Sequence, residues 1–497
     1  MKVSPSFEDA RTQLNAGETV ILTAVRADDL LTPVAAYLKL GGLDSHTFLL
    51  ESVEGGAWRG RYSAVGLDPD LIWQCRDGEV REARGPDAVA QRTFTPVSTD
   101  PMQALRDVIA DARCPLPEGA PSIASGLFGY LGYDMVRYLE RLPDGAAADP
   151  QDVPEAYLMR PRTMVVFDAL KQEIQIFAPV RPGGEDTETA YKAAVARIEA
   201  ALAALDGELA DIGPANGGLG EIRSNRTPEN YGEAVNAARD YIRAGDAFQV
   251  VPSQRFTADY PADPFHLYRT LRRLNPSPFL FFFRLDGFAI AGSSPEILVR
   301  LRDDVVTVRP IAGTRKRGAT PAEDDALEAD LLADPKERSE HLMLLDLGRN
   351  DVGRVAAPGS VRITQREIVE RYSHVMHIVS NVEGDLAEDE DAVSALFAGF
   401  PAGTVSGAPK VRAMEIIDEL EPHRRGIYAG CVGYFSADGG MDTCIALRTA
   451  VIKDGKMNVQ AGAGVVLDSD PVAEHDECVN KAAALFRAAD VSLGGER

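Results

Sequence analysis

Apolar side chains in the first 200 residues follow two spacings, which predict strands and helices. Short runs rich in apolar and β-branched residues are typical of strands, whereas apolar residues three and four positions apart are typical of helices. The expected strands are residues 18–26, 46–53, 163–168 and 173–180, the last two as a pair. The expected helices are residues 32–40, 101–113 and 185–205.

A glycine- and proline-rich break interrupts this pattern at GPANGGLGE, residues 213–221. Such residues punctuate regular structure, so we predict a linker at 205–226 between an N-terminal region, residues 1–204, and a second region, residues 227–490. Thr227 and Pro228 begin the second region as a helix, with a capping hydroxyl followed by a proline whose missing N–H is harmless there.

The second region also contains blocks of strands and helices. Strands are expected at 247–256, 279–285, 289–294, 297–301 and, in MDTCIALRTA, at 441–450. Helices are expected at 335–351 and at 470–489, the latter capped by Asp470 before Pro471. Because the elements come in blocks and do not strictly alternate, the sequence predicts an α+β fold, a two-lobed sandwich of antiparallel β-sheets flanked by helices.

Composition and charge narrow the class of protein. The chain is 45% apolar and 26% charged, which is ordinary for a soluble enzyme. Acidic residues outnumber basic ones 76 to 52, a net charge of −24 that repels phosphate backbones and anionic lipids. We therefore expect neither a nucleic-acid nor a membrane partner. An anionic substrate would need local positive charge or a metal.

Cysteine usage and the chain start favour the cytoplasm. The N-terminal segment lacks the apolar core of a signal peptide, and no run approaches the roughly 20 apolar residues of a membrane span. An odd number of irregularly spaced cysteines argues against a disulfide framework or a zinc site. These cysteines are Cys75, Cys114, Cys431, Cys444 and Cys478.

Two predicted helices each carry a pair of carboxylates on one face. Glu337 and Glu340 are three residues apart, as are Glu474 and Glu477, and Lys481 follows on the second face. The apolar run at 342–347 predicts that the first helix is substantially buried. Buried acids are costly unless compensated, and oxygen ligands favour Mg²⁺ or Mn²⁺. Spacing alone leaves open the alternative that both faces are simply solvated.

Four longer segments resemble the chorismate-utilising enzymes, the family that includes anthranilate, aminodeoxychorismate, isochorismate and salicylate synthases. They occur in the family's order between about 226 and 490, slightly over half of the chain. They are PIAGTRKRG (310–318), PKERSEHLMLLDLGRNDVGRV (335–355), PAGTVSGAPKVRAMEIIDELE (401–421) and QAGAGVVLDSDPVAEHDECVNKAAA (460–484).

The resemblance implies one active-site Mg²⁺ that holds the ring carboxylate of chorismate. Glu340 and Glu477 match its direct ligands, and Glu337 and Glu474 match acids that hold metal-bound waters. A metal would separate the substrate carboxylate from the protein carboxylates, which answers the problem posed by the net charge.

Other residues match positions around the substrate. Arg448 matches the arginine that pairs with the enolpyruvyl carboxylate, and Tyr428 matches its hydroxyl partner. His377 matches a histidine near the departing hydroxyl and is a candidate proton donor. Further substrate-binding candidates are Gly313, Thr314, Gly462, Ala463, Gly464 and Lys481. Lys410 is another possible contact for the substrate anion. Thr314 and Thr404 match positions beside the ring and are also catalytic candidates.

Three of these motifs have other interpretations, either as purely structural features or as sites of another kind. His374 and His377 form an HxxH pair, which could also be a metal-ligand, packing or surface feature. AGAGVV lacks the third glycine of a dinucleotide loop. In GTVSGAPK, Ala408 breaks the phosphate-loop spacing and Pro409 removes a backbone donor, which disfavours an ATPase.

Two missing lysines indicate the expected product. Isochorismate and salicylate synthases carry a water-activating lysine where this chain has Gln249, which we include with the catalytic candidates. Aminodeoxychorismate synthases commonly read PIKGT, whereas this chain has Ala312. Ammonia attack at C2 followed by pyruvate elimination would then yield anthranilate, the first step of tryptophan biosynthesis. An aminodeoxychorismate synthase component and a non-catalytic tryptophan- or chorismate-binding regulator remain alternatives.

Ammonia is expected from a second protein, because the chain lacks a GxCxG glutaminase elbow with a downstream HxE; AGCVG has Ala429 in place of the first glycine. The expected assembly is a hetero-oligomer, a heterotetramer with a glutamine amidotransferase subunit.

LLES (49–52) and NPSPFLFF (275–282) resemble segments of the family's tryptophan feedback pocket. Phe279 and Leu280 depart from the usual NPSPYMF, and LLES could instead be a buried strand end. The expected lining is Glu51, Ser52, Pro278, Phe279, Leu280, Gly433 and Tyr434.

Overall fold

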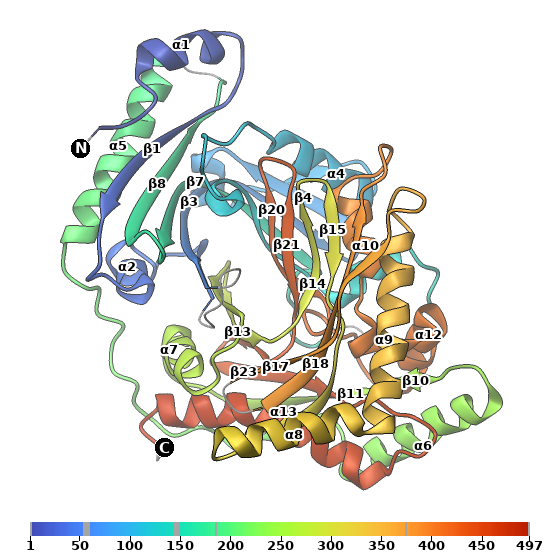
Figure 1. The fold of residues 1–497 in the computed structure, drawn as a ribbon. Coiled ribbons are helices and arrows are strands. Elements are labelled where there is room, and N and C mark those ends of the chain that lie inside the picture. The colour runs from blue at the N-terminus through green and yellow to red at the C-terminus, as the bar shows by residue number, and fades with distance from the viewer. Residues whose placement is uncertain (1, 53–59, 144–148, 184–185, 373–374, 496–497) are drawn as a thin grey trace.

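Antiparallel pairing joins the described strands into a branched sheet of 21 strands and a separate two-stranded ribbon. A computed structural model describes residues 2–52, 60–143, 149–183, 186–372 and 375–495. Helices α1 and α5 lie beside β1 and β8 at one end, whereas α6, α9 and α12 lie at the other (Figure 1). The expected α+β fold of antiparallel sheets flanked by helices is confirmed.

The strands differ widely in length, from two to 15 residues. They are β1 Val20–Ala27, β2 Thr47–Glu51, β3 Tyr62–Arg76, β4 Glu79–Arg84, β5 Thr95–Val97, β6 Gly126–Leu131, β7 Ala156–Asp168, β8 Glu173–Val180, β9 Arg223–Ser224, β10 Gln249–Val250, β11 Ser253–Asp259, β12 Phe279–Arg284, β13 Phe288–Ser294, β14 Ile297–Arg302, β15 Val305–Val308, β16 Ile311–Lys316, β17 Arg362–Arg371, β18 Val375–Asp385, β19 Gly407–Ala408, β20 Cys431–Ser436, β21 Met441–Ile445, β22 Thr449–Lys453 and β23 Lys456–Gly462.

Most long helices begin at a proline that follows a side-chain cap. The α-helices are α1 Phe7–Asn15, α2 Pro33–Lys39, α3 Pro86–Ala90, α4 Pro101–Asp111, α5 Thr187–Asp206, α6 Pro228–Ala244, α7 Pro264–Leu274, α8 Pro321–Ala333, α9 Pro335–Gly353, α10 Ala392–Gly399, α11 Gly403–Ser406, α12 Lys410–Leu420 and α13 Pro471–Ser492. Among the described helices, none combines the length and apolarity that crossing a bilayer requires.

Local sequence signals located most predicted elements correctly. The caps at Thr227 and Asp470 are confirmed, because their side chains accept backbone N–H groups of α6 and α13. The strand expected at 247–256 is divided into β10 and β11 around Pro252, which has no N–H to donate to a ladder. The strand expected at 441–450 is also wrong as a single element, because Arg448 lies between β21 and β22 with φ +48°.

Strands from both sequence regions pair with each other. β2 pairs with β12, and β6 pairs with β20, so the sheet continues across the predicted boundary. At the second seam Gly129 faces Gly433; a Cβ there would lie 1.9 Å from the Tyr157 carbonyl oxygen or 2.1 Å from that of Asp442. The chain between Asp206 and Arg223 contains no helix or strand, and the division into two domains around a linker at 205–226 stays a prediction.

The aromatic core spans the first seam. Phe48 on β2 is fully buried and stacks on Phe128 and Phe283, with ring centroids 4.7 and 5.2 Å apart. These three rings come from both regions, so the apolar contacts that hold the regions together are the contacts that stabilise each one.

Phe48→Ala should therefore lower the free energy of unfolding of the whole chain by about 3–5 kcal/mol, the usual range for an emptied aromatic site. Urea denaturation followed by fluorescence and circular dichroism measures this, with both signals shifting together. Leu170→Ala, at a side chain that is 74% exposed, is the matched control and should change stability by less than about 0.5 kcal/mol. Separate transitions, with only one shifted, would contradict a shared core.

Candidate active site

The predicted site residues converge on one cavity of about 640 Å³. Its walls come from α9, α11, α13, β10, β16, β18 and β23, which are distant in sequence. All of the predicted catalytic, substrate-binding and metal-binding residues except Ala463 and Lys410 line it. These residues are Gln249, Gly313, Thr314, Glu337, Glu340, His377, Thr404, Tyr428, Arg448, Gly462, Gly464, Glu474, Glu477 and Lys481.

Two capped helix starts bring the acidic pairs to this cavity. Asp334 accepts hydrogen bonds from the first N–H groups of α9, and Asp470 does the same for α13. Glu337 and Glu474 therefore lie in the first turn of their helices, where the aligned peptide dipoles stabilise negative charge, and Glu340 and Glu477 follow one turn later. The expectation that α9 is substantially buried is only partly correct, since Leu344 and Leu345 are buried but Leu342 is 53% exposed.

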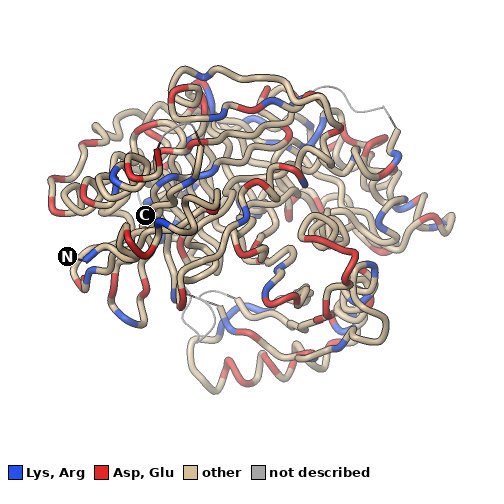
Figure 2. Tube along the Cα trace, turned by 90° about the horizontal axis from the view of Figure 1, so that it is seen from above, with Lys and Arg blue, Asp and Glu red and all other residues tan. Residues whose placement is uncertain are grey.

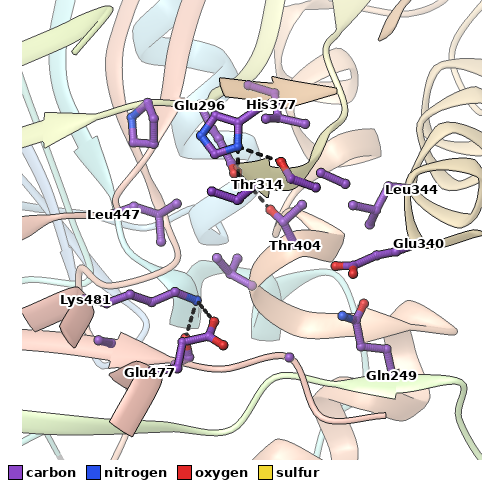
Figure 3. A pocket seen from close by; sticks show the side chains of 18 of the residues that line it. Gln249, Glu296, Thr314, Glu340, Leu344, His377, Thr404, Leu447, Glu477 and Lys481 are labelled. Carbon is purple, nitrogen blue, oxygen red and sulfur yellow. Dashed lines mark hydrogen bonds and ion pairs between the residues drawn. The ribbon is translucent and has the colours of Figure 1, made fainter. Parts of the chain in front are cut away.

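The acids repel one another across the cavity. Burial raises the pKa of Glu340, and the charges of Glu337 and Glu477 raise it further. Burial likewise raises the pKa of Glu474, and the charge of Glu477 adds to that shift. Lys481 offsets part of this charge, because its Nζ lies 2.6 Å from Glu477 Oε1 (Figure 3).

The carboxylates of α9 and α13 suit a magnesium ion better than a metal whose ligands all come from the protein. Within the described ranges, no three His, Cys, Asp or Glu side chains are grouped to hold a metal ion. Mg²⁺ commonly keeps several waters and takes only one or two carboxylates together with oxygens of its substrate. Glu340 and Glu477 could act as such a pair, because each carries uncompensated or partly compensated charge toward the same space.

Arg448 is available to an anionic ligand. Its guanidinium lines the cavity and has no hydrogen-bond partner among the described side chains, and burial lowers its pKa. Tyr428 stands nearby, with its hydroxyl oxygen 2.9 Å from where a Cβ on Gly462 would lie. Glycine at that position therefore leaves room for the tyrosine hydroxyl at the cavity wall.

Gln249 presents an unused acceptor to the cavity. Its Oε1 is buried and has no hydrogen-bond partner in the described part of the chain, which is costly unless a ligand or water supplies a donor. Its amide packs over Gly464, where an added Cβ would lie 2.6 Å from Gln249 Nε2. Ala463, between the two glycines, is fully buried and lies outside the lining.

The suggestion that Lys410 contacts a substrate anion is wrong for this structure. Its Nζ lies 3.1 Å from both carboxylate oxygens of Asp351 and 3.4 Å from the Ala398 carbonyl oxygen, and it does not line the cavity. The lysine starts α12 and points to the far part of α9, so its charge is already neutralised by the protein.

His377 and Thr314 form the cavity wall that lies across from Glu477 and Lys481, with Thr404 beside them (Figure 3). His377 Nδ1 lies 2.8 Å from the Gly313 carbonyl oxygen and 3.2 Å from Thr314 Oγ1. A carbonyl can only accept, so Nδ1 carries the hydrogen and Nε2 keeps its lone pair. Burial lowers the pKa of His377, which at neutral pH favours a proton acceptor over the proton donor that the resemblance implied. His374, its partner in the HxxH pattern, lies outside the described residues.

Glu296 is a site residue that the sequence analysis missed. It follows β13 in the segment SSPE, lines the cavity, and accepts a hydrogen bond from Thr404 Oγ1 at 3.0 Å (Figure 3). Burial raises the pKa of Glu296. The available sequence signal is an acid between two apolar strands. A single acid in that position is less distinctive than the carboxylate pairs on the two helices.

A second cavity of about 620 Å³ lies at the seam between β2, β12 and β20. All seven residues of the predicted tryptophan pocket line it: Glu51, Ser52, Pro278, Phe279, Leu280, Gly433 and Tyr434. The Glu51 carboxylate is engaged by the protein, because Arg272 donates two hydrogen bonds to it, at 2.7 and 2.8 Å, and Tyr268 donates another at 2.5 Å. Its role in ligand binding stays a prediction.

Comparison with known proteins decides the family. The profile of the chorismate binding enzymes matches residues 68–487. The chain belongs to this family. Anthranilate synthase component 1 of Cereibacter sphaeroides is 58% identical over 98% of the chain and 97% of its own length. The Pseudomonas aeruginosa protein of the same name is 48% identical, with 93% of each chain covered.

Solved structures of the family share the fold. Anthranilate synthase component I from Streptococcus pneumoniae superposes with a TM-score of 0.77 at 35% identity, covering 93% of this chain and 98% of that one. The menaquinone-specific isochorismate synthase of Escherichia coli gives 0.70 at 20% identity, covering 96% and 99%. That second likeness concerns the fold alone.

The environment of His377 predicts an imidazole that titrates below 6.5, the ordinary value for histidine, because burial disfavours the imidazolium. Below pH 6.5 the unfolded chain binds this proton more readily, so His377 should make the fold less stable as the pH falls through that range. NMR of ring-labelled histidine measures the pKa, and His377→Asn assigns the signal by its loss. A midpoint at or above 6.5 would contradict the buried, neutral ring.

Proposed function

We propose that the chain is the large subunit of an anthranilate synthase, which aminates chorismate at C2 with ammonia and then eliminates pyruvate. The observation that carries the proposal is one cavity in which two acidic helix starts lie across from Arg448 and His377. Chorismate has a carboxylate on its ring and another on its enolpyruvyl group. The acids, through Mg²⁺, and the arginine would hold these two ends of the substrate.

The choice of ammonia over water rests on Gln249 and Ala312. Both line the cavity, and neither side chain can act as a base. The unpartnered Oε1 of Gln249 can accept a hydrogen bond from ammonia but cannot remove a proton from water. High identity to proteins named anthranilate synthase component 1 supports the same choice.

Magnesium would be held by Glu340 and Glu477, with Glu337 and Glu474 accepting from its waters. When bound, the ion neutralises the ring carboxylate and stabilises negative charge that develops at that end of the ring. The fit is chemical: burial and neighbouring carboxylates both raise the pKa values of Glu340 and Glu474, and a bound cation would offset both effects.

Two residues with opposite pKa shifts suit the two proton transfers. In the first step the bond from nitrogen to C2 forms, the ring double bonds shift and the C4 hydroxyl departs, taking a proton to leave as water. Glu296, whose pKa is raised by burial, is placed to donate that proton. In the second step C2 loses its proton, the C3–oxygen bond breaks and pyruvate leaves. His377, with a free Nε2, is suited to accept that proton.

A separate glutamine amidotransferase would supply ammonia, in a heterotetramer of both subunits in the cytoplasm. The second cavity would bind tryptophan as feedback inhibitor. It lies at the β2–β12 seam, so a ligand there could alter the packing of the two sequence regions and, through it, the active site. The name component 1, carried by the relatives, accords with a partner subunit.

The first prediction from this proposal concerns the product. Protein incubated with chorismate, Mg²⁺ and ammonium at alkaline pH should form fluorescent ortho-aminobenzoate, and free pyruvate in equal amount. Chromatography with mass detection checks both. A non-aromatic 4-amino product without pyruvate would identify an aminodeoxychorismate synthase instead, and chorismate binding without turnover would indicate a regulator.

A second prediction tests the metal ligands. Glu340→Gln removes a negative charge and should raise the Mg²⁺ concentration needed for half-maximal activity by at least about tenfold, equivalent to about 1.4 kcal/mol of binding free energy. The matched control is Asp346→Asn, on the same helix, whose carboxylate is 76% exposed and pairs with Arg349. Equal magnesium dependence in both variants would remove Glu340 from the metal site.

A third prediction tests the proton donor. Glu296→Gln keeps the acceptor for Thr404 but cannot release a proton, so kcat for chorismate loss should fall about 10²–10⁴-fold, the usual worth of general acid catalysis. The affinity for chorismate should change much less. Stopped-flow measurement of chorismate absorbance gives kcat, and a variant with more than a tenth of the original rate would exclude this role.

A further inference from the structure

A buried ion pair lies behind the active-site wall without lining the cavity. The side chains of Arg425 and Glu421 are 1% and 4% exposed. Arg425 Nε donates to Glu421 Oε2 at 3.0 Å, and Nη2 donates to Oε1 at 2.6 Å. Both residues follow the end of α12, four positions apart, and neither lines the cavity.

The remaining guanidinium donors hold two separate walls of the active site. Arg425 Nη1 donates to the carbonyl oxygen of Val405 at 2.7 Å, next to Thr404 on α11. Nη2 donates to the carbonyl oxygen of Val251 at 2.6 Å, two residues after Gln249. One planar group therefore sets the distance between two backbone segments that carry side chains into the cavity.

The same guanidinium also contacts a third wall. Its Cζ lies 5.5 Å from the centre of the Tyr428 ring and 4.8 Å from that of Tyr133. Tyr428 lines the cavity, whereas Tyr133 belongs to η2 (Tyr133–Tyr138) in the N-terminal region. A cation beside an aromatic ring is attractive, so Tyr428 is fixed from behind while its hydroxyl reaches the substrate space.

Glu421 extends this arrangement to β11 and β23. Its Oε1 accepts hydrogen bonds from Ser253 N at 2.7 Å and from Ser253 Oγ at 2.8 Å. Ser253 Oγ in turn accepts from Gln460 Nε2 at 2.8 Å, and Gln460 lines the cavity. Ser253 also pairs with Gly462 in the sheet, so the acid holds the residue that lies opposite this glycine of the cavity wall.

We propose that the Arg425–Glu421 pair is a positioning element for the reaction, which holds Thr404, Gln249, Tyr428 and Gly462 in one relative geometry. A buried ion pair by itself contributes little to stability, because desolvation offsets its attraction. An ion pair that joins four walls of one site can instead fix the positions of the reacting groups. A displacement of such a group by 1 Å costs about 10²-fold in rate. The inference rests on the proposed function, since it concerns the rate of that reaction.

The test compares two conservative variants with the unmodified protein. Arg425→Lys keeps the charge but offers a single nitrogen, which cannot reach both carbonyls and both carboxylate oxygens. Glu421→Gln keeps the volume and an acceptor for Ser253 but removes the charge that orients the guanidinium. We expect kcat for anthranilate formation to fall at least 100-fold in Arg425→Lys and at least tenfold in Glu421→Gln.

A split between rate and affinity separates positioning from a general loss of structure. The dissociation constant of chorismate, measured by titration calorimetry with Mg²⁺ and without ammonia, should rise less than tenfold, because Arg448 and the acidic helices still hold the substrate. The matched control is Arg160→Lys, a 9% exposed arginine bound to Asp70 and Asp111 and remote from the cavity, which should keep kcat within twofold.

Each outcome is decisive. A folded Arg425→Lys variant with kcat within threefold of the unmodified protein would overturn the proposal. Failure of both variants to fold, under conditions where Arg160→Lys folds, would assign the pair to stability and overturn it as well. If the unmodified protein makes no anthranilate, the proposed function fails; if it does and both variants keep their rate, only the positioning role fails.

Discussion

Repulsion between carboxylates that face one cavity is the constraint on which the site depends. Burial raises the pKa values of Glu340 and Glu474, the neighbouring acids of α9 and α13 raise them further, and an anionic substrate would add more negative charge. Lys481 and Arg448 offset only part of this negative charge. Because the chain has a net charge of −24, its more distant residues supply no net positive charge to compensate for the rest. Acidic and basic positions are interspersed along the whole trace, so the compensation has to be local (Figure 2). A divalent cation satisfies that requirement with the fewest ligands.

The arrangement of helices and strands also reduces this repulsion between the acids. One acid of each pair, Glu337 or Glu474, lies in the first turn of a capped helix, where the helix dipole favours negative charge before any metal binds. The opposite wall is built from strand ends and turns, which place Glu296, His377 and Arg448 among apolar neighbours. Burial then raises the pKa of Glu296 and lowers that of His377, and the proposed donor and acceptor roles rest on these opposite shifts. The buried Arg425 connects these walls from behind.

Features encoded locally were predictable, and features made by distant contacts were not. The proline-led helix starts, the caps at Thr227 and Asp470 and the shared face of Glu474 and Glu477 follow from short-range rules. Their meeting across one cavity followed from family resemblance, since spacing alone allowed a solvated surface. The contacts of Glu296 with Thr404, of Lys410 with Asp351 and of Arg448 with Ser293 join residues 108, 59 and 155 positions apart, where short-range patterns carry no information.

In the proposed function a cation and the substrate carboxylate bind together, because the cation offsets the repulsion between the substrate and the acids, and the substrate carboxylate adds a ligand for the cation. Titration calorimetry of Mg²⁺ with and without saturating chorismate, in the absence of ammonia, measures this directly. The account predicts at least tenfold tighter Mg²⁺ binding with chorismate, and by linkage the same factor for chorismate with Mg²⁺. Equal magnesium affinity in both titrations would contradict it.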